Sequence, residues 1–182
     1  MPRLVTRSFP YGLRFNGTTN YVDLTTAAFE WERTQAFSFS LWMSSDKTTA
    51  TQTQSVIGKI ESGANFRGLT IRLSQSVAGE IGLLLNNNAT GTNRLYVRTA
   101  ANAYRPGVPF HLVVTYDGSS TSGGCAIIVN GVNMTLTTVT NALSATILNT
   151  ASATIGARNN TDIFLSGNIF KAHVFTDVLS LA

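Results

Sequence analysis

The alternation of apolar and polar positions is clearest in residues 110–131, FHLVVTYDGSSTSGGCAIIVNG. In the first seven of these residues, successive side chains of an extended strand would point to opposite faces, and both faces are largely apolar. A strand with two apolar faces is typical of a buried layer. Asp117-Gly118 supplies turn residues, 125–129 begins a second apolar run, and Asn130-Gly131 is a strong hairpin signal. This segment therefore predicts paired antiparallel strands within an all-β core.

Similar short runs recur along the chain, separated by polar loops. They cover residues 12–15, 21–24, 37–43, 55–60, 68–73, 80–85, 94–99, 110–116, 125–129, 134–139, 153–156 and 164–175. About a dozen short strands at this spacing are typical of a sandwich or a barrel. Residues 25–33 alone could form a helical turn, so the predicted fold class is all-β.

Composition narrows the functional classes. The chain has 182 residues, 12% of them charged, with a net charge of +4 and a single cysteine, Cys125. One domain suits this length, and no intrachain disulfide can form. Cys125 lies in an apolar run, which favours a buried, unreactive thiol. The basic residues are scattered rather than gathered on one face, so we expect no nucleic-acid partner.

The N-terminal residues 1–10, MPRLVTRSFP, predict an arm in front of a domain at 11–182. Pro2 and Pro10 discourage regular structure there. The arm lacks the continuous apolar stretch of a signal peptide, and no apolar run is long enough to cross a membrane, so we expect no membrane partner. Arg3 and Arg7 in this arm are candidate docking residues for an acidic protein partner.

Six phrases occur in an order that resembles a known family: FNGT followed by YV, FSFSLWM, HLVVTYDG, IIVNG, ATIGAR and FLSGNIFKAHVFTDVLS. The succession, from about residue 13 to 180, resembles the laminin G-like and pentraxin-like branch of the concanavalin A-like jelly rolls. The resemblance implies a two-sheet antiparallel β-sandwich (jelly roll) in a single domain.

The resemblance also raises the question of catalysis. Related glucanases place three acids on one strand, and no strand of this chain carries that pattern. Glu30 and Glu32 come nearest, but they flank Trp31 in a connection before the strand at 37–43. His111 and His173 have no compact cluster of further ligands around them in the sequence, and both are interpreted as structural. We therefore expect a non-enzymatic protein with no catalytic residues.

Calcium is the one cofactor that the resemblance suggests, because many relatives bind it at one edge of the sandwich. The candidate ligands are Asp23, Asp117 and Asp162, although each of them also suits a turn or a surface position. A hard cation prefers six to eight oxygen ligands, commonly with several carboxylates. The loop at 158–162 offers one acid beside an arginine, which is a poor cage.

Candidate glycan-binding residues lie in the polar loops and on one strand. In FSFSLWM, the apolar set alternates with Ser38, Ser40 and Trp42, so the tryptophan faces away from the core. It could stack on a sugar or fill a second layer. The candidate ligand-binding set is Trp42, Asn86, Asn87, Asn88, Asn93 and Tyr104. The alternative is that these loops are solvent-exposed connections without a specific role.

Three functional hypotheses follow. The first is a non-enzymatic structural or adhesion module, a bacteriophage virion protein in capsid decoration or tail association. It would lie on the virion surface, with its arm docked on other virion or surface proteins or on a symmetry mate. Its motivation is a jelly roll with its own initial Met, no signal peptide and a hydroxyl-rich surface. The alternative is a carbohydrate-binding, lectin-like module, with or without calcium. A glycan hydrolase or lyase would require an acid pair that the sequence does not show.

Overall fold

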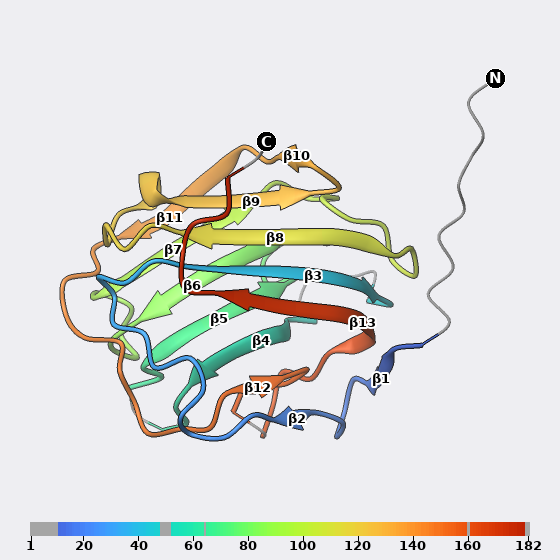
Figure 1. The fold of residues 1–182 in the computed structure, drawn as a ribbon, viewed down its shortest axis with the longest axis horizontal. Helices are drawn as coiled ribbons and strands as arrows, with labels where there is room; N and C mark the ends of the chain where they lie inside the picture. The colour runs from blue at the N-terminus through green and yellow to red at the C-terminus, as the bar shows by residue number, and fades with distance from the viewer. Residues whose placement is uncertain (1–10, 48–51, 64, 160, 181–182) are drawn as a thin grey trace.

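The computed structural model describes residues 11–47, 52–63, 65–159 and 161–180, and it forms two antiparallel sheets packed face to face (Figure 1). The strands are β1 (Leu13–Asn16), β2 (Val22–Asp23), β3 (Phe37–Ser45), β4 (Gln54–Ile60), β5 (Gly68–Leu73), β6 (Ile81–Asn86), β7 (Arg94–Thr99), β8 (Phe110–Tyr116), β9 (Cys125–Val129), β10 (Val132–Asn133), β11 (Leu136–Asn141), β12 (Thr154–Ile155) and β13 (Ser166–Phe175). A short 3-10 turn, η1 (Ser122–Gly124), precedes β9. The prediction of an all-β two-sheet sandwich in a single domain is confirmed.

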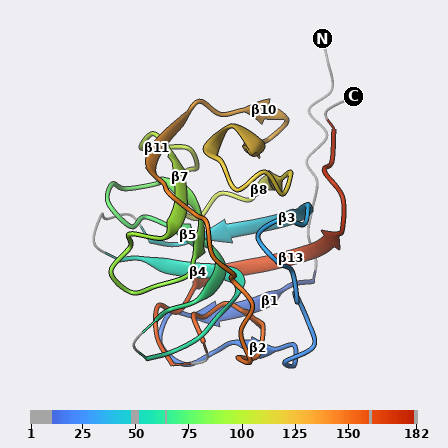
Figure 2. The same ribbon diagram turned by 90° about the vertical axis from the view of Figure 1, so that its left-hand side faces the viewer.

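The first sheet, sheet A, has the order β1-β13-β3-β8-β9-β10, and the second, sheet B, has the order β11-β7-β6-β5-β4-β12-β2. Consecutive strands β4 to β7 form a meander in sheet B, whereas β13 returns from the C-terminal end to pair with both β1 and β3. Figure 2 shows the two sheets from the side. Among the described residues, no helix is long and apolar enough to span a membrane.

The helical turn expected within residues 25–33 is wrong. This connection consists of turns and bends, and Thr25 and Phe29 have φ angles of 84° and 55°. Left-handed backbone at both positions interrupts the repeated right-handed geometry that a helix requires. Aromatic packing sets the path of the connection instead, because Trp31 stacks on Phe37 with a centroid separation of 4.9 Å.

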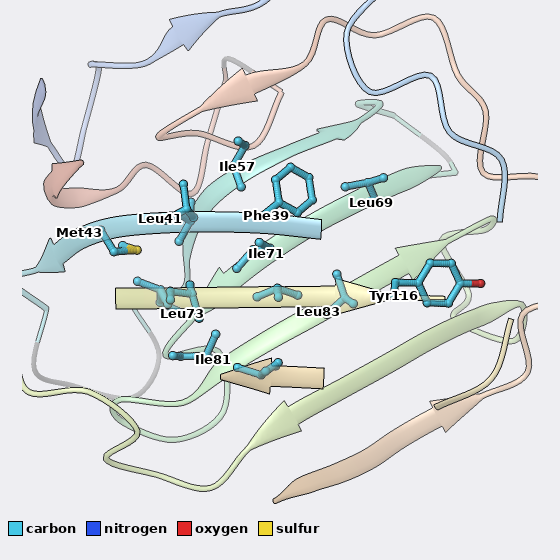
Figure 3. Packing of buried hydrophobic residues seen from close by; sticks show 14 of the residues in the cluster. Phe39, Leu41, Met43, Ile57, Leu69, Ile71, Leu73, Ile81, Leu83 and Tyr116 are labelled. Atoms are coloured by element: carbon cyan, nitrogen blue, oxygen red, sulfur yellow. The ribbon is translucent and has the colours of Figure 1, made fainter. Parts of the chain in front are cut away.

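The inner faces of the two sheets form the core (Figure 3). Phe37, Phe39, Leu41 and Met43 are fully buried, as the alternation in FSFSLWM predicts. They face side chains such as Ile71 from sheet B. Interdigitation of two such apolar faces is the ordinary way in which a β-sandwich removes its apolar surface from water.

The side chains on the two faces of β8 are buried in different surroundings. Leu112 and Val114 lie in the core, while Val113 and Thr115 on the opposite face are also buried. After β13, the chain crosses the outer face of β3, β8 and β9 (Figure 1). The Ser38 hydroxyl fixes this crossing, because it donates to the Asp177 carbonyl at 2.7 Å and accepts from the Leu179 amide at 3.0 Å. The C-terminal segment therefore provides the second layer that the pattern of β8 requires.

Candidate functional site

Arginine and tyrosine side chains gather on the outer face of sheet B because of strand alternation. In β7, Leu95 and Val97 are buried in the core, so Arg94, Tyr96 and Arg98 lie on the other face. In β5, the core side chains are those of residues 69, 71 and 73, which places Arg72 on the same outer face. Antiparallel pairing then places Arg72 and Arg98 in register on either side of Gly82 in β6, so that the cationic positions of β5 and β7 share one face.

A small pocket of about 140 Å³ lies on this face. It is lined by Phe66, Arg72, Leu84, Asn86, Ala89, Arg94 and Arg158. Its apolar surroundings are a second cluster, separate from the main core, formed by Ile60, Leu84 and Tyr96 with Phe66 packed against them. Three guanidinium groups beside an apolar surface could hold an anionic group and pack against the ring of a ligand.

Arg72 is the central cation of this pocket. Its Nη1 donates to Gln75 Oε1 at 3.1 Å, but its Nε is buried and has no hydrogen-bond partner among the described residues. Burial, together with the nearby charge of Arg158, lowers the pKa of Arg72 to about 10. One buried N–H of this guanidinium therefore lacks an acceptor within the part of the chain that the structure describes.

Tyr96 offers a second unsatisfied group on the same face. Its ring covers Gly82, where an added Cβ atom would lie 2.8 Å from the ring carbon Cε2 and 3.2 Å from the hydroxyl oxygen. The hydroxyl is buried without a hydrogen-bond partner in the described parts of the chain. Burial raises the pKa of Tyr96 to about 12, so the phenol remains a hydrogen-bond donor at neutral pH.

The other two pocket arginines have local partners. The Arg158 guanidinium lies 4.8 Å from the centroid of the Phe66 ring, and its Nε donates to Asp162 Oδ1 at 2.8 Å. Arg94 donates from Nε to Thr140 Oγ1 at 3.0 Å. These contacts hold the two guanidinium groups in place around the pocket.

The asparagines expected to contact a ligand mostly organise loops. Asn86 does line the pocket, and its amide donates to the carbonyls of Asn65 and Phe66, which fixes the turn that carries the Phe66 ring. Asn87 donates to the Thr146 carbonyl. The side chains of Asn88 and Asn93 bond within the loop between β6 and β7 and to the residues around Ser144.

Trp42 and Tyr104 lie away from these asparagines. Trp42 is half-buried on the outer face of sheet A, where its ring stacks on His111 with a centroid separation of 5.1 Å. Tyr104 is 4% exposed, stacks on Phe110 in the core and shares a hydrogen bond of 2.9 Å with the Ser74 hydroxyl. The expectation that Tyr104 presents a stacking surface to a glycan is therefore wrong, because both its ring and its hydroxyl are used inside the protein.

The three aspartates expected as calcium ligands do not meet. Asp23 Oδ1 accepts the Thr25 amide at 2.9 Å, Asp117 Oδ1 accepts the Ser119 amide at 2.8 Å, and Asp162 pairs with Arg158. In the described ranges, no group of three histidine, cysteine or acidic side chains is placed to hold a metal ion. The expected docking residues Arg3 and Arg7 lie outside the described residues.

Glu30 and Glu32, the acids that come nearest to a catalytic pair in the sequence, make structural contacts. Glu30 pairs with Nζ of the buried Lys59 at 3.3 Å, and Glu32 Oε1 accepts the amides of Arg33 and Ile147. Neither acid faces the arginine pocket, whose lining residues come from other segments.

The pocket arginines have a sequence signal that lies in the strands rather than in loops or motifs. In RLYVRT and GLTIRL, arginine alternates with aliphatic residues within a strand. This pattern places a cation on the face opposite the core, where a solvated β-sheet more often carries threonine or serine. What the pattern does not reveal is that Arg158, from a distant loop, completes the group.

Comparisons with known proteins agree with this architecture. The sequence pattern of the concanavalin A-like lectin/glucanases superfamily matches residues 16–182. No curated protein matches the chain in sequence.

Solved structures give the same picture of the fold. The CBM40 of the Ruminococcus gnavus IT-sialidase, bound to alpha2,3 sialyllactose, superposes with a TM-score of 0.68 at 18% identity over 93% of this chain and 91% of that chain. The NanB sialidase from Streptococcus pneumoniae superposes with a TM-score of 0.66 at 19% identity, and the match covers 93% of this chain but 26% of the sialidase. The botulinum neurotoxin serotype G binding domain gives 0.61 at 13% identity, over 93% of this chain and 44% of that domain.

Proposed function

Because the chain belongs to the concanavalin A-like lectin/glucanases superfamily, we propose that it is a non-enzymatic carbohydrate-binding module for glycans that carry a carboxylate. The observation that carries this proposal is Arg72, a partly buried guanidinium that forms no ion pair among the described residues and whose Nε lacks a hydrogen-bond partner there. The binding surface is the pocket on the outer face of sheet B, and the ligand's carboxylate would be held there by guanidinium groups.

The energetics of burial support an anionic ligand. A buried charge without a counter-charge costs several kcal/mol of folding stability, about 3 to 5 kcal/mol where a partner has been removed. A sugar carboxylate placed against the Arg72 guanidinium would supply a counter-charge, which no ion pair among the described residues provides. Guanidinium groups bind carboxylates with particular geometric selectivity, because their parallel N–H donors match the two oxygens.

The apolar surroundings of the pocket support a sugar as the body of the ligand. Phe66 and Leu84 line the pocket together with the amide of Asn86. Ring faces of sugars pack against apolar side chains, while their hydroxyls need hydrogen-bond partners at the rim. The likeness to a domain bound to sialyllactose, an acidic trisaccharide, supports the same ligand class on grounds independent of the arginines.

Calorimetric titration with sialyllactose and with lactose tests the proposal. We expect binding of the acidic trisaccharide and at least about tenfold weaker binding by Arg72→Met, because a charged hydrogen bond contributes about 1.5 to 3 kcal/mol. Arg14→Met is the matched control, since Arg14 pairs with Asp46 at 2.7 Å on the sheet A side of the molecule. Equal affinity for acidic and neutral glycans would contradict the role of Arg72, and release of free sugar from the bound glycan would contradict a non-enzymatic module.

A structural or adhesion role on a bacteriophage virion stays a prediction, and it is compatible with glycan binding. The arm at residues 1–10 precedes β1 at the edge of sheet A, whereas the arginine pocket lies on sheet B. Removal of residues 1–10 should abolish incorporation into particles and leave glycan binding unchanged. Normal incorporation of the shortened chain would contradict docking through Arg3 and Arg7.

A further inference from the structure

A carboxylate of the protein itself already binds one of the pocket arginines. Of the three guanidinium groups that line it, only Arg158 has a carboxylate partner among the described residues, and that partner is Asp162. Two nitrogens on one edge of the guanidinium take part. Nε donates to Asp162 Oδ1, and Nη2 donates to Asp162 Oδ2. This two-point contact uses the edge of Arg158 that would otherwise bind a ligand carboxylate in the same way.

The loop holds this carboxylate in place through its backbone. Arg158 and Asp162 form an isolated β-bridge in which the Arg158 amide donates to the Asp162 carbonyl at 2.9 Å. Asn159 and Ile163 adopt left-handed φ angles of 59° and 53°, an unusual conformation for a β-branched residue such as isoleucine. The chain thus accepts local strain in the segment that sets Asp162 against Arg158.

The two partners differ in their exposure to water. The Arg158 side chain is 16% exposed and rests on Phe66, while the Asp162 side chain is 46% exposed at the rim. Displacement of the pair would return a half-exposed carboxylate to water and leave the guanidinium in position on the ring. A ligand carboxylate that takes the place of Asp162 would restore the two-point contact on Arg158, so the exchange returns only the half-exposed aspartate to water.

We propose that Asp162 is a specificity-determining residue, which occupies Arg158 until a ligand carboxylate held by Arg72 takes its place. This inference rests on the proposed binding of acidic glycans. A neutral sugar gains nothing from displacing Asp162, and an anion that does not reach Arg72 meets the repulsion of the aspartate at the rim. Asp162 therefore lowers the affinity for all acidic ligands and penalises most those that contact Arg158 alone.

We call this competition of Asp162 for Arg158 the gate. Asp162→Asn tests it, because asparagine preserves the size of the side chain and removes its charge. With 3'-sialyllactose, we expect about 3- to 10-fold tighter binding than by the wild-type chain, because the ligand no longer competes with a charged side chain for Arg158. Lactose affinity should not change. Asp46→Asn is the matched control, since it removes an equal charge and an equivalent aspartate–arginine pair at Arg14, outside the pocket, and should leave both affinities unchanged.

The outcomes separate the gate from the binding function. Tighter sialyllactose binding by Asp162→Asn, and also by Asp162→Ala, supports the gate. Unchanged or weaker binding by folded Asp162→Asn overturns it, and weaker binding would show that the aspartate positions Arg158 for the ligand. If the wild-type chain and both variants bind no acidic glycan, the proposed function fails and the gate fails with it. Thermal unfolding of each variant establishes that the compared chains are folded.

Discussion

Replacing Arg72 by methionine should make the protein more stable, because the arginine is kept charged in a place that disfavours charge. Burial first, and repulsion from Arg158 second, lower its pKa well below its ordinary value, to about 10. At about 1.4 kcal/mol per pKa unit, this shift corresponds to a penalty of about 3 kcal/mol on the folded state. Loss of the hydrogen bond to Gln75 should offset about 1 kcal/mol of the gain.

The expected net gain for Arg72→Met is therefore about 2 kcal/mol, or about 4 to 8 °C in Tm for a chain of this length. Its sign follows from the lowered pKa of a base. Below pH 10, Arg72 is protonated in both the folded and the unfolded chain, so the penalty is present in full at neutral pH. As the pH rises above about 10, the folded chain loses the proton before the unfolded chain does, and the penalty disappears.

The same substitution at Arg98 should have the opposite effect. Arg98 Nη1 lies 3.1 Å from Glu80 Oε2, and the Glu80 side chain is 1% exposed. Arg98→Met leaves that carboxylate buried and unpaired, although the Ser76 amide still donates to Glu80 Oε1 at 2.8 Å. We expect a loss of about 3 kcal/mol. Two neighbouring arginines on one sheet face thus differ in the sign of their effect on stability.

Urea unfolding at pH 7, followed by tryptophan fluorescence, measures both variants on the same scale. A stabilised Arg72→Met chain that has lost binding to sialyllactose would identify Arg72 as a residue retained for its ligand at the expense of stability. The opposite result would be a loss of about 1 kcal/mol or more in the free energy of unfolding of Arg72→Met. It would show that the guanidinium stabilises the fold, and it would refute the argument from its uncompensated charge.

Three further predictions concern other parts of the structure. Gly82→Ala should push the ring of Tyr96 off the sheet, since the added Cβ would lie 2.8 Å from Cε2; we expect weaker sialyllactose binding by calorimetry and a stability loss of about 1 to 2 kcal/mol in urea. Tyr104→Phe should cost about 1 kcal/mol in the same unfolding assay through the lost hydrogen bond to Ser74, and an effect on glycan affinity would contradict its place in the core. Burial raises the pKa of the Cys125 thiol to about 12, so at pH 8 iodoacetamide should modify it at least about 100-fold more slowly than a free thiol, as mass spectrometry would show.

The strands could be predicted from the sequence because their cause is local. Alternation in FSFSLWM places Phe39 and Leu41 in the core directly, and the Asn130-Gly131 turn ends β9 where expected. The turn at Phe29 could not be predicted in this way, because its ring packs edge-to-face against Phe39, ten positions along the chain, with a left-handed backbone at Phe29. The prediction of Tyr104 in a binding loop fails for a related reason. Its sequence neighbours are those of a polar loop, whereas the residue on which its ring stacks, Phe110, lies several positions later on β8.

The candidate site was hard to predict because it combines strand residues such as Arg72 and Arg94 with Phe66 and Arg158 from separate loops. Each strand positions its arginine by simple alternation, and Arg72 alone would look like an ordinary solvated residue. What distinguishes it is the combination of Phe66, Leu84 and Tyr96, which pack on this face, with the absence of an ion pair to Arg72 among the described residues. Strand pairing brings these features together across separate segments of the chain. The charge is therefore local to the sequence, but its burial is a property of the fold, and the proposed anion site depends on both.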